Sequence, residues 1–165
     1  MTVASGSALA SPVDKIYLTN EMMFKKALEG LSIEQLFYRP TETNTPMLWI
    51  AGHIPETRTS VLKLMGEEFE TGWGDLFKRG HILKDAAGYP TISEIFATLD
   101  ELSARLHARL TSLSDEQLSS AAVGPKFPNS NTLLEQIGFL AWHESYHVGQ
   151  LAYIRRSLGF AGIVG

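Results

Sequence analysis

Apolar residues recur every three to four positions along most of the chain, a spacing that places them on one face of an α-helix. Strand signals, by contrast, are scarce. The pattern predicts four long helices, which run from Val13 to Leu28, from Pro46 to the residue before Gly66, from Thr91 through Leu110, and from Asn131 or Thr132 to Leu158. The chain is therefore expected to be all-α.

Two short segments between the long helices have nearly the same sequence, LSIEQL at 31–36 and LSDEQL at 113–118. In the first, Ser32 and Gln35 have the spacing of a capping box, which predicts a short helix. Each segment follows a long helix and precedes another that carries histidine. The chain thus reads as two similar helical halves that build a four-helix bundle.

The connection between the halves, residues 66–90, has five glycines and no clean period. A connection of this length allows the bundle to depart from a simple up-down order, and such loops are often functional.

The composition indicates a single globular domain. The chain has 165 residues, of which 44% are hydrophobic and 19% charged. We expect residues 12–165 to form the domain and residues 1–11, which lack the features of a signal peptide, to form a flexible tail. A net charge of -4 argues against a nucleic-acid partner. No segment approaches the roughly 20 apolar residues of a membrane span. A cytoplasmic protein that acts on a small molecule is expected.

The histidines are the strongest candidates for chemistry. The chain has no cysteine, so a transition metal would need His, Asp or Glu ligands. At about 100° per residue, His143 and His147 fall within about 40° of each other on the apolar side of the last helix. His53 shares the apolar stripe of the second helix with Trp49 and Thr57.

Two interpretations of these three histidines remain open. They can converge on one divalent transition ion, such as Zn, Ni or Fe, and leave a coordination position open for water or substrate. They can also be core residues, each with a buried hydrogen-bond partner. His81 and His107 are expected at the surface.

The segment HESYH at 143–147 matches the signature of zinc peptidases, but its required context is missing. The extended form of that signature needs Gly at 150 and His at 153, where this chain has Gln150 and Tyr153. The other form needs a downstream glutamate, and no acidic residue follows Glu144. A peptidase is therefore not expected.

Several neighbouring residues are candidates for supporting roles. Glu144, beside His143, is either a proton acceptor or a carboxylate that supports the site from outside. Gln150 lies one turn beyond His147 and would orient a ligand or a bound water. Asn20, on the inward stripe of the first helix, lines the pocket or satisfies a buried backbone group. Trp142 and Tyr146 are expected to pack.

The inward His53 in WIAGHI, followed by His143, His147, Gly149 and Gln150 in an H-x-x-x-H-x-G-Q run, resembles the DinB-like superfamily, which includes YfiT-type metal-dependent proteins. The resemblance covers nearly the whole chain. It implies a four-helix bundle with a nonconsecutive connection and one divalent metal held by His53, His143 and His147.

The resemblance also implies a homodimer, since many members are dimeric. Some relatives are transferases or isomerases that use bacillithiol or mycothiol. One position departs from the family pattern: the residue after the second C-terminal histidine is often basic in relatives and is Val148 here.

Three functions follow from these expectations. The first is a metal-dependent transferase, with a low-molecular-weight thiol as a candidate cofactor, or a hydrolase of a small molecule. The second is a non-catalytic metal-binding module of the stress-response type. The third is a scaffold without metal.

Overall fold

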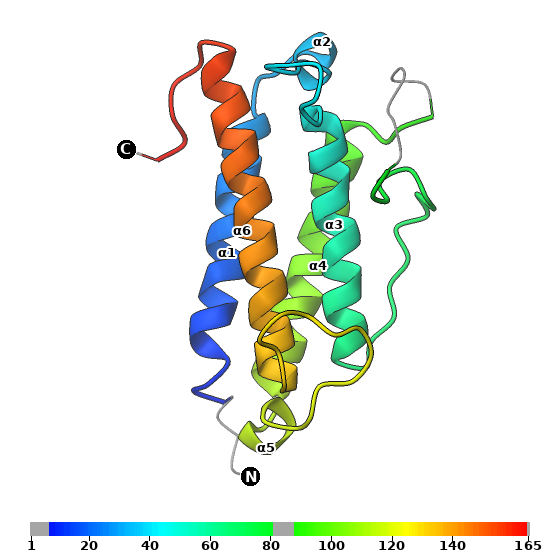
Figure 1. The fold of residues 1–165 in the computed structure, drawn as a ribbon, viewed down its shortest axis with the longest axis vertical. Coiled ribbons are helices and arrows are strands. Elements are labelled where there is room, and N and C mark those ends of the chain that lie inside the picture. The colour runs from blue at the N-terminus through cyan, green and yellow to red at the C-terminus, as the bar shows by residue number, and fades with distance from the viewer. Residues whose placement is uncertain (1–6, 81–87, 165) are drawn as a thin grey trace.

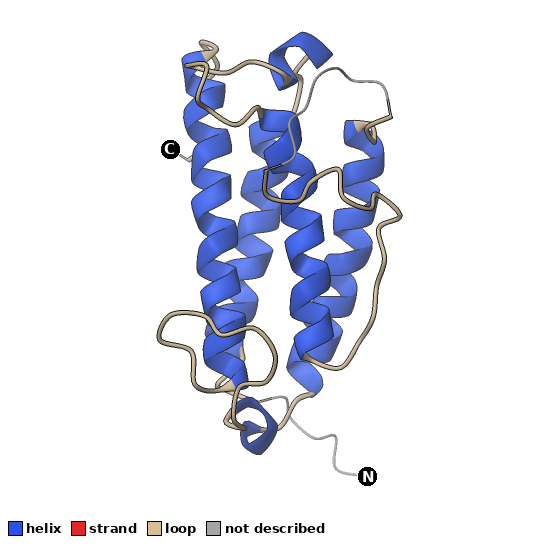
Figure 2. Cartoon of the chain, turned by 45° about the vertical axis from the view of Figure 1, so that its right-hand side comes forward, coloured by secondary structure: helices blue, strands red, loops and turns tan. Residues whose placement is uncertain are grey.

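The computed structural model describes residues 7–80 and 88–164. Among them it has four long and two short helices: α1 (Ser11–Leu28), α2 (Ile33–Leu36), α3 (Met47–Leu64), α4 (Ile92–Ser112), α5 (Asp115–Leu118) and α6 (Leu133–Ser157). No strand is present in the described ranges, where β-pairing is limited to an isolated bridge between Ala121 and Thr132 (Figure 2). The predicted all-α four-helix bundle is confirmed.

The order of the helices around the bundle is nonconsecutive. The principal contacts join α1 to α6, α6 to α3, α3 to α4 and α4 to α1. Helices α1 and α3, which the segment with α2 connects, therefore lie diagonally opposite each other. The same holds for α4 and α6, which the segment with α5 connects. The two connections cross the bundle at opposite ends (Figure 1). As a result, α3 and α6 lie side by side although the whole of α4 separates them in sequence.

The long connection has a topological cause. Helices α3 and α4 run in the same direction, so the chain must return along the full length of α3 before α4 can begin (Figure 1). At about 1.5 Å per residue, the 18 residues of α3 span about 27 Å. The returning segment runs along the outside of α3 (Figure 2). It brings Phe77 next to α3, where the Phe77 carbonyl oxygen lies 3.0 Å from Nδ1 of His53.

Local sequence signals fix most helix starts. Capping boxes form at Ser32 with Gln35, at Thr91 with Glu94, at Ser114 with Gln117, and at Thr132 with Glu135. The start of α3 differs from the prediction. Pro46 has an extended ψ of 153° and is the N-cap, so the helix begins at Met47 without a side-chain cap.

The N-terminal boundary also differs from the expected tail of residues 1–11. Residues 1–6 lie outside the described part of the chain. Ala10 is buried and α1 begins at Ser11, so the packed chain starts before residue 12.

The core consists of two apolar clusters separated by one polar layer. The cluster nearer α2 includes Phe24, Ile54 and Leu99, and the cluster nearer α5 includes Val61, Leu106 and Ile137. Between them lies the polar layer, which we define as Arg58, Glu144, Glu21, Ser103 and the carbonyl of Tyr17. No helix in the described ranges has the length and apolar content that a membrane crossing requires.

Candidate metal centre

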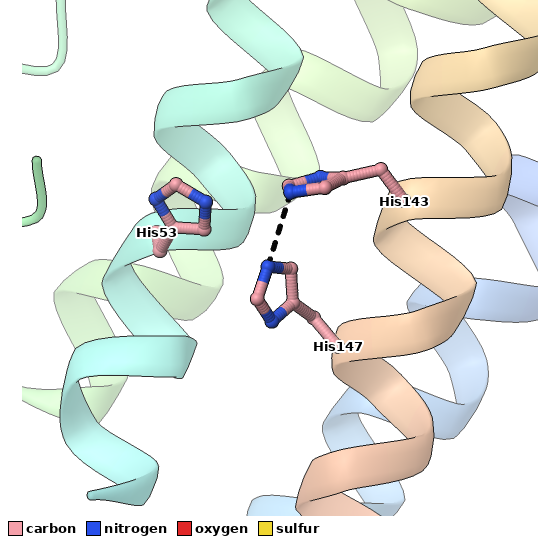
Figure 3. A group of neighbouring side chains, drawn as sticks. All are labelled: His53, His143 and His147. Atoms are coloured by element: carbon pink, nitrogen blue, oxygen red, sulfur yellow. Dashed lines mark hydrogen bonds between the residues drawn. The ribbon is translucent and has the colours of Figure 1, made fainter. Parts of the chain in front are cut away.

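Three histidines converge between α3 and α6. His53 extends from α3, and His143 and His147 extend from successive turns of α6, so that the three rings face one another across the gap between the helices (Figure 3). One potential ligand atom from each residue lies within 4.8 Å of those of the other two. The prediction that these rings come within reach of a single ion is therefore confirmed.

The spacing of the α6 pair fits a shared metal. The Nε2 atoms of His143 and His147 lie 3.2 Å apart. Two nitrogens bound to a tetrahedral zinc at about 2.0–2.1 Å are themselves about 3.3 Å apart. The i,i+4 spacing thus places two nitrogens at ligand–ligand distance.

Two of the three rings are oriented by a second hydrogen bond. Nδ1 of His53 lies 3.0 Å from the carbonyl oxygen of Phe77, and Nδ1 of His147 lies 2.7 Å from Oε1 of Gln150. Donation from Nδ1 to these oxygens leaves Nε2 of both rings unprotonated, which is the usual arrangement around histidine ligands. The Gln150 side chain is held in turn, because its own amide nitrogen Nε2 donates to the Tyr146 hydroxyl at 3.1 Å.

His143 differs from the other two ligand candidates. Its Nδ1 atom is buried and has no hydrogen-bond partner among the described residues. With Nδ1 of His147 donating to Gln150, Nε2 of His143 carries the proton of the 3.2 Å hydrogen bond to Nε2 of His147. Transfer of that proton to the unpartnered Nδ1 would free the Nε2 lone pair of His143 for a metal.

Burial keeps the cluster uncharged. It is the largest cause of the lowered pKa of all three imidazoles, and it lowers the pKa of His147 to about 4. For His147, the nearby His143 and His53 add to this lowering, and the hydrogen bond to Gln150 opposes it. At neutral pH the rings are therefore neutral, which is the protonation state that binds metals.

The family model of the DinB superfamily matches residues 17–151, a range that contains all three histidines. The chain belongs to the DinB superfamily. No functionally curated protein matches the sequence.

Solved structures share the fold of this DinB-superfamily chain. YfiT from Bacillus subtilis, described as a probable metal-dependent hydrolase with an unusual four-helix bundle topology, superposes with a TM-score of 0.71 at 19% identity, covering 98% of this chain and 94% of its own. A conserved protein from Enterococcus faecalis superposes with a TM-score of 0.67 at 15% identity, covering 94% of this chain and 96% of its own. At these identities the comparison establishes the fold.

Glu144 is engaged away from the histidines. It is 1% exposed, and both of its carboxylate oxygens accept hydrogen bonds from Arg58, one from Nε and one from Nη2, each at 2.9 Å. This bidentate pair occupies the carboxylate, so its placement favours the supporting role over that of a proton acceptor.

The other predicted neighbours are distributed between the site and the bundle. Trp49 stacks on His53 with ring centroids 4.4 Å apart and lines the site. The Thr57 hydroxyl donates to the backbone carbonyl of His53 at 3.0 Å. Asn20 lies between α1 and α6, where it donates to the Ala141 carbonyl at 3.4 Å and accepts from Ser145 at 3.1 Å. It therefore satisfies a buried backbone group, which was one of its two predicted roles.

Two residues that support the site escaped the sequence analysis. Phe77 supplies its carbonyl to His53, and its ring occupies the space where a side chain at Gly52 would lie, since a Cβ there would be 2.2 Å from the ring. Arg58 pairs with Glu144. The sequence offered one signal for each contact. Gly52 directly precedes the ligand candidate His53, and Arg58 is a lone arginine on the apolar stripe between Ile54 and Leu62.

The remaining histidines are separate from the site. Nδ1 of His107 lies 2.8 Å from Oδ1 of Asp14, and its side chain is half exposed, as expected for the surface. His81 lies outside the described residues. Trp142 and Tyr146 were expected to pack, but they are 60% and 55% exposed on the outer face of α6.

Proposed function

We propose that this protein is a metal-dependent enzyme that acts on a small molecule, and that His53, His143 and His147 hold one divalent transition ion such as Zn, Ni or Fe. The observation that carries the proposal is the convergence of the three rings, with the Nε2 atoms of His143 and His147 3.2 Å apart. The hydrogen bond between these two nitrogens accounts for the α6 pair alone, whereas a shared ion accounts for the convergence of His53 as well.

A bound ion would act as a Lewis acid and would lower the pKa of a water or thiol at its open position. The protein residues have defined tasks beside it. Phe77 and Gln150 fix the orientations of His53 and His147, and Trp49 covers the face of the His53 ring. These contacts would hold the ligand geometry without rearrangement when substrate binds.

The state of Glu144 favours a transferase over a hydrolase. A hydrolase that activates water commonly needs a carboxylate or imidazole as general base, and the carboxylate beside the ligands is already paired with Arg58. A low-molecular-weight thiol has a much lower pKa than water and depends less on such a base. We therefore infer transfer of a thiol to an electrophile as the leading activity. The fold shared with the B. subtilis protein supports hydrolysis as the alternative.

Metal content tests the first part of this proposal. The purified protein should contain about one transition-metal ion per chain, and zinc added after chelation should raise its melting temperature. His143→Ala should weaken metal binding by more than the roughly 10–100-fold that loss of an outer partner costs. His107→Ala, a histidine on α4 that pairs with Asp14, is the matched control and should leave affinity unchanged. A wild-type protein that binds no metal would rule out the proposal.

Turnover separates an enzyme from a metal-binding module. The zinc- or nickel-loaded protein is incubated with a thiol and monobromobimane or an epoxide, and separately with activated esters. Thiol transfer that requires metal and His143 supports the transferase, and metal-dependent ester cleavage without thiol supports the hydrolase. Tight metal binding with a closed shell of four ligands and no turnover identifies the non-catalytic module.

A further inference from the structure

A cavity of about 430 Å³ lies in the groove between α3 and α6, towards the α5 end of the bundle. Its lining comes from α3, from α6 and from the loop of residues 119–132, which is yellow in Figure 1 and crosses in front of these helices. The lining is mainly apolar, with Leu64, Val123, Pro125, Phe127 and Leu140, and its polar side chains are Ser60 and Lys63. Its size falls within the range typical of small-molecule sites.

The cavity is aligned with the histidine cluster. At about 100° per residue, Ser60 and Leu64, which line the cavity, lie within about 20° of the direction of His53 on α3, and Leu140 lies within about 20° of His147 on α6. The helices are antiparallel, so these residues lie on the same side of the cluster. Along the axis of α3, Ser60 is about 10 Å from His53, and along the axis of α6, Leu140 is about 4.5 Å from His143.

A continuous row of aromatic rings joins the cavity to the cluster along α6. Phe127, in the cavity wall, stacks on Phe139 with centroids 4.9 Å apart, and Phe139 contacts Trp142 at 5.5 Å. Trp142 then stacks on Tyr146 at 6.3 Å, and Tyr146 contacts the metal-ligand candidate His147 at 5.3 Å. Large rings left exposed in this way commonly mark a ligand surface.

We propose that this groove binds the apolar part of the substrate, so that the substrate is an amphiphilic small molecule. Its reactive polar group lies at the three histidines, and an aliphatic or aromatic tail follows the aromatic row into the cavity that Phe127 and Leu140 line. This inference rests on the proposed function, because the histidines must present an ion to the polar group. It adds a substrate class to that function.

A second cavity provides the competing location for the tail. It has a volume of about 510 Å³ and its lining includes Asn44, Ser145, Gln150 and Tyr153, with no charged side chain. Its hydrogen-bonding side chains would lose partners if an apolar tail displaced water from them. The first cavity has two hydrogen-bonding side chains, Ser60 and Lys63, and the ammonium of the exposed Lys63 can remain in water. Its smaller desolvation cost is why we assign the tail to it.

A matched pair of metal-binding probes tests the assignment. Acetohydroxamic acid and octanohydroxamic acid have the same chelating head and differ in six methylene groups. Binding of each to the zinc-loaded full chain is measured by calorimetry. Burial of four of the six methylenes should make the longer probe bind about 200-fold more tightly, since each buried methylene contributes about fourfold.

Variants in the two cavities locate the tail. Phe127→Ala should reduce the preference for the longer probe to less than about fivefold while acetohydroxamic acid binds unchanged. Val123→Glu, at an exposed position in the same lining, should have the same effect and does not disturb the core. Tyr153→Ala, in the competing cavity, is the control and should leave the preference intact.

Equal binding of the two probes to the wild type would overturn the inference while leaving the metal centre in place. Loss of the preference in Tyr153→Ala but not in Phe127→Ala would place the tail in the second cavity and also overturn it. Failure of the protein to take up zinc, or of acetohydroxamic acid to bind the zinc-loaded chain, would instead count against the proposed function itself.

Discussion

The same pair of helices, α3 and α6, carries two polar groups of opposite character. In the polar layer, Arg58 and Glu144 are each 1% exposed, and they pair through two hydrogen bonds of 2.9 Å. Arg58 also donates to the Tyr17 carbonyl at 3.0 Å and to the Ser103 hydroxyl, and lies 3.7 Å from Glu21. A single guanidinium on α3 thus contacts the other three long helices.

The histidine cluster, about one turn away, has the reverse properties. Its rings are neutral because burial lowers their pKa values, and two Nε2 atoms face each other at 3.2 Å. The polar layer has satisfied its charges and hydrogen bonds within the fold. The cluster instead brings three neutral imidazoles together, and the buried Nδ1 of His143 has no hydrogen-bond partner among the described residues. The completeness of its hydrogen bonds distinguishes the buried ion pair from the proposed metal site, even though the two groups share helices and adjacent residues.

Breaking the polar layer should have the largest effect on stability. Arg58→Met removes the partner of a fully buried carboxylate, which typically costs about 3–5 kcal/mol of unfolding free energy. Denaturation in urea measures this cost. Arg105→Met removes an exposed i,i+4 pair with Glu101 and is the control, with an expected loss below about 1 kcal/mol.

The double variant Arg58→Met/Glu144→Leu sharpens this result. Because it removes both charges, it should recover much of the loss seen in Arg58→Met. If Arg58→Met were no more destabilising than Arg105→Met, the polar layer would not be the saturated structural group that its geometry indicates.

The two groups also differ in how far the sequence predicts them. The helical period fixes which face of a helix a residue occupies, and that was enough to place His53, His143 and His147 inside the bundle. The same period places Arg58 on an inward stripe but cannot say that Glu144, 86 residues later, lies opposite. Glu144 was therefore assigned by its sequence neighbour His143, although its partner is on another helix.

Loop contributions were beyond prediction for a different reason. Capping boxes such as Ser32 with Gln35 are local, so the sequence predicts them correctly. The contact of Phe77 with Gly52 and His53 depends on the path of a connection that has no periodic signal. The parallel arrangement of α3 and α4 determines that path, and it is a property of the whole topology.

Within the histidine cluster, removal of an orienting partner should weaken metal binding without affecting the fold. Gln150→Leu leaves Nδ1 of His147 without its acceptor, and loss of such a partner typically lowers metal affinity by about 10–100-fold. Competition with a chromophoric chelator measures the affinity. Unfolding free energy should change by no more than about 0.5 kcal/mol, since Gln150 is only partly buried.

Gln150→Glu is the conservative variant, because a carboxylate also accepts the Nδ1 proton. It should retain metal affinity near that of the wild type. Equal losses in Gln150→Leu and Gln150→Glu would show that the amide acts by filling space or contacting Tyr146, and not by orienting the ring.

The smallest expected effect on metal affinity comes from the contact of Gly52 with Phe77, a residue of the long connection between α3 and α4. A methyl group at Gly52 would lie 2.2 Å from the Phe77 ring, closer than packed atoms approach, so Gly52→Ala must displace that ring. Displacement would move the Phe77 carbonyl from Nδ1 of His53, and we expect metal affinity to fall about tenfold, the lower end of the range for outer partners. The same chelator competition measures it.

Two further variants separate this mechanism from a general helix effect. Gly138→Ala adds a methyl group where nothing lies within 4 Å, so it should leave metal affinity unchanged and stabilise α6 by up to about 1 kcal/mol. Phe77→Ala removes the clashing ring, so the addition of Gly52→Ala to it should cost little further affinity. Additive losses in the double variant would mean that Gly52→Ala acts on His53 through the helix and not by displacing the Phe77 ring.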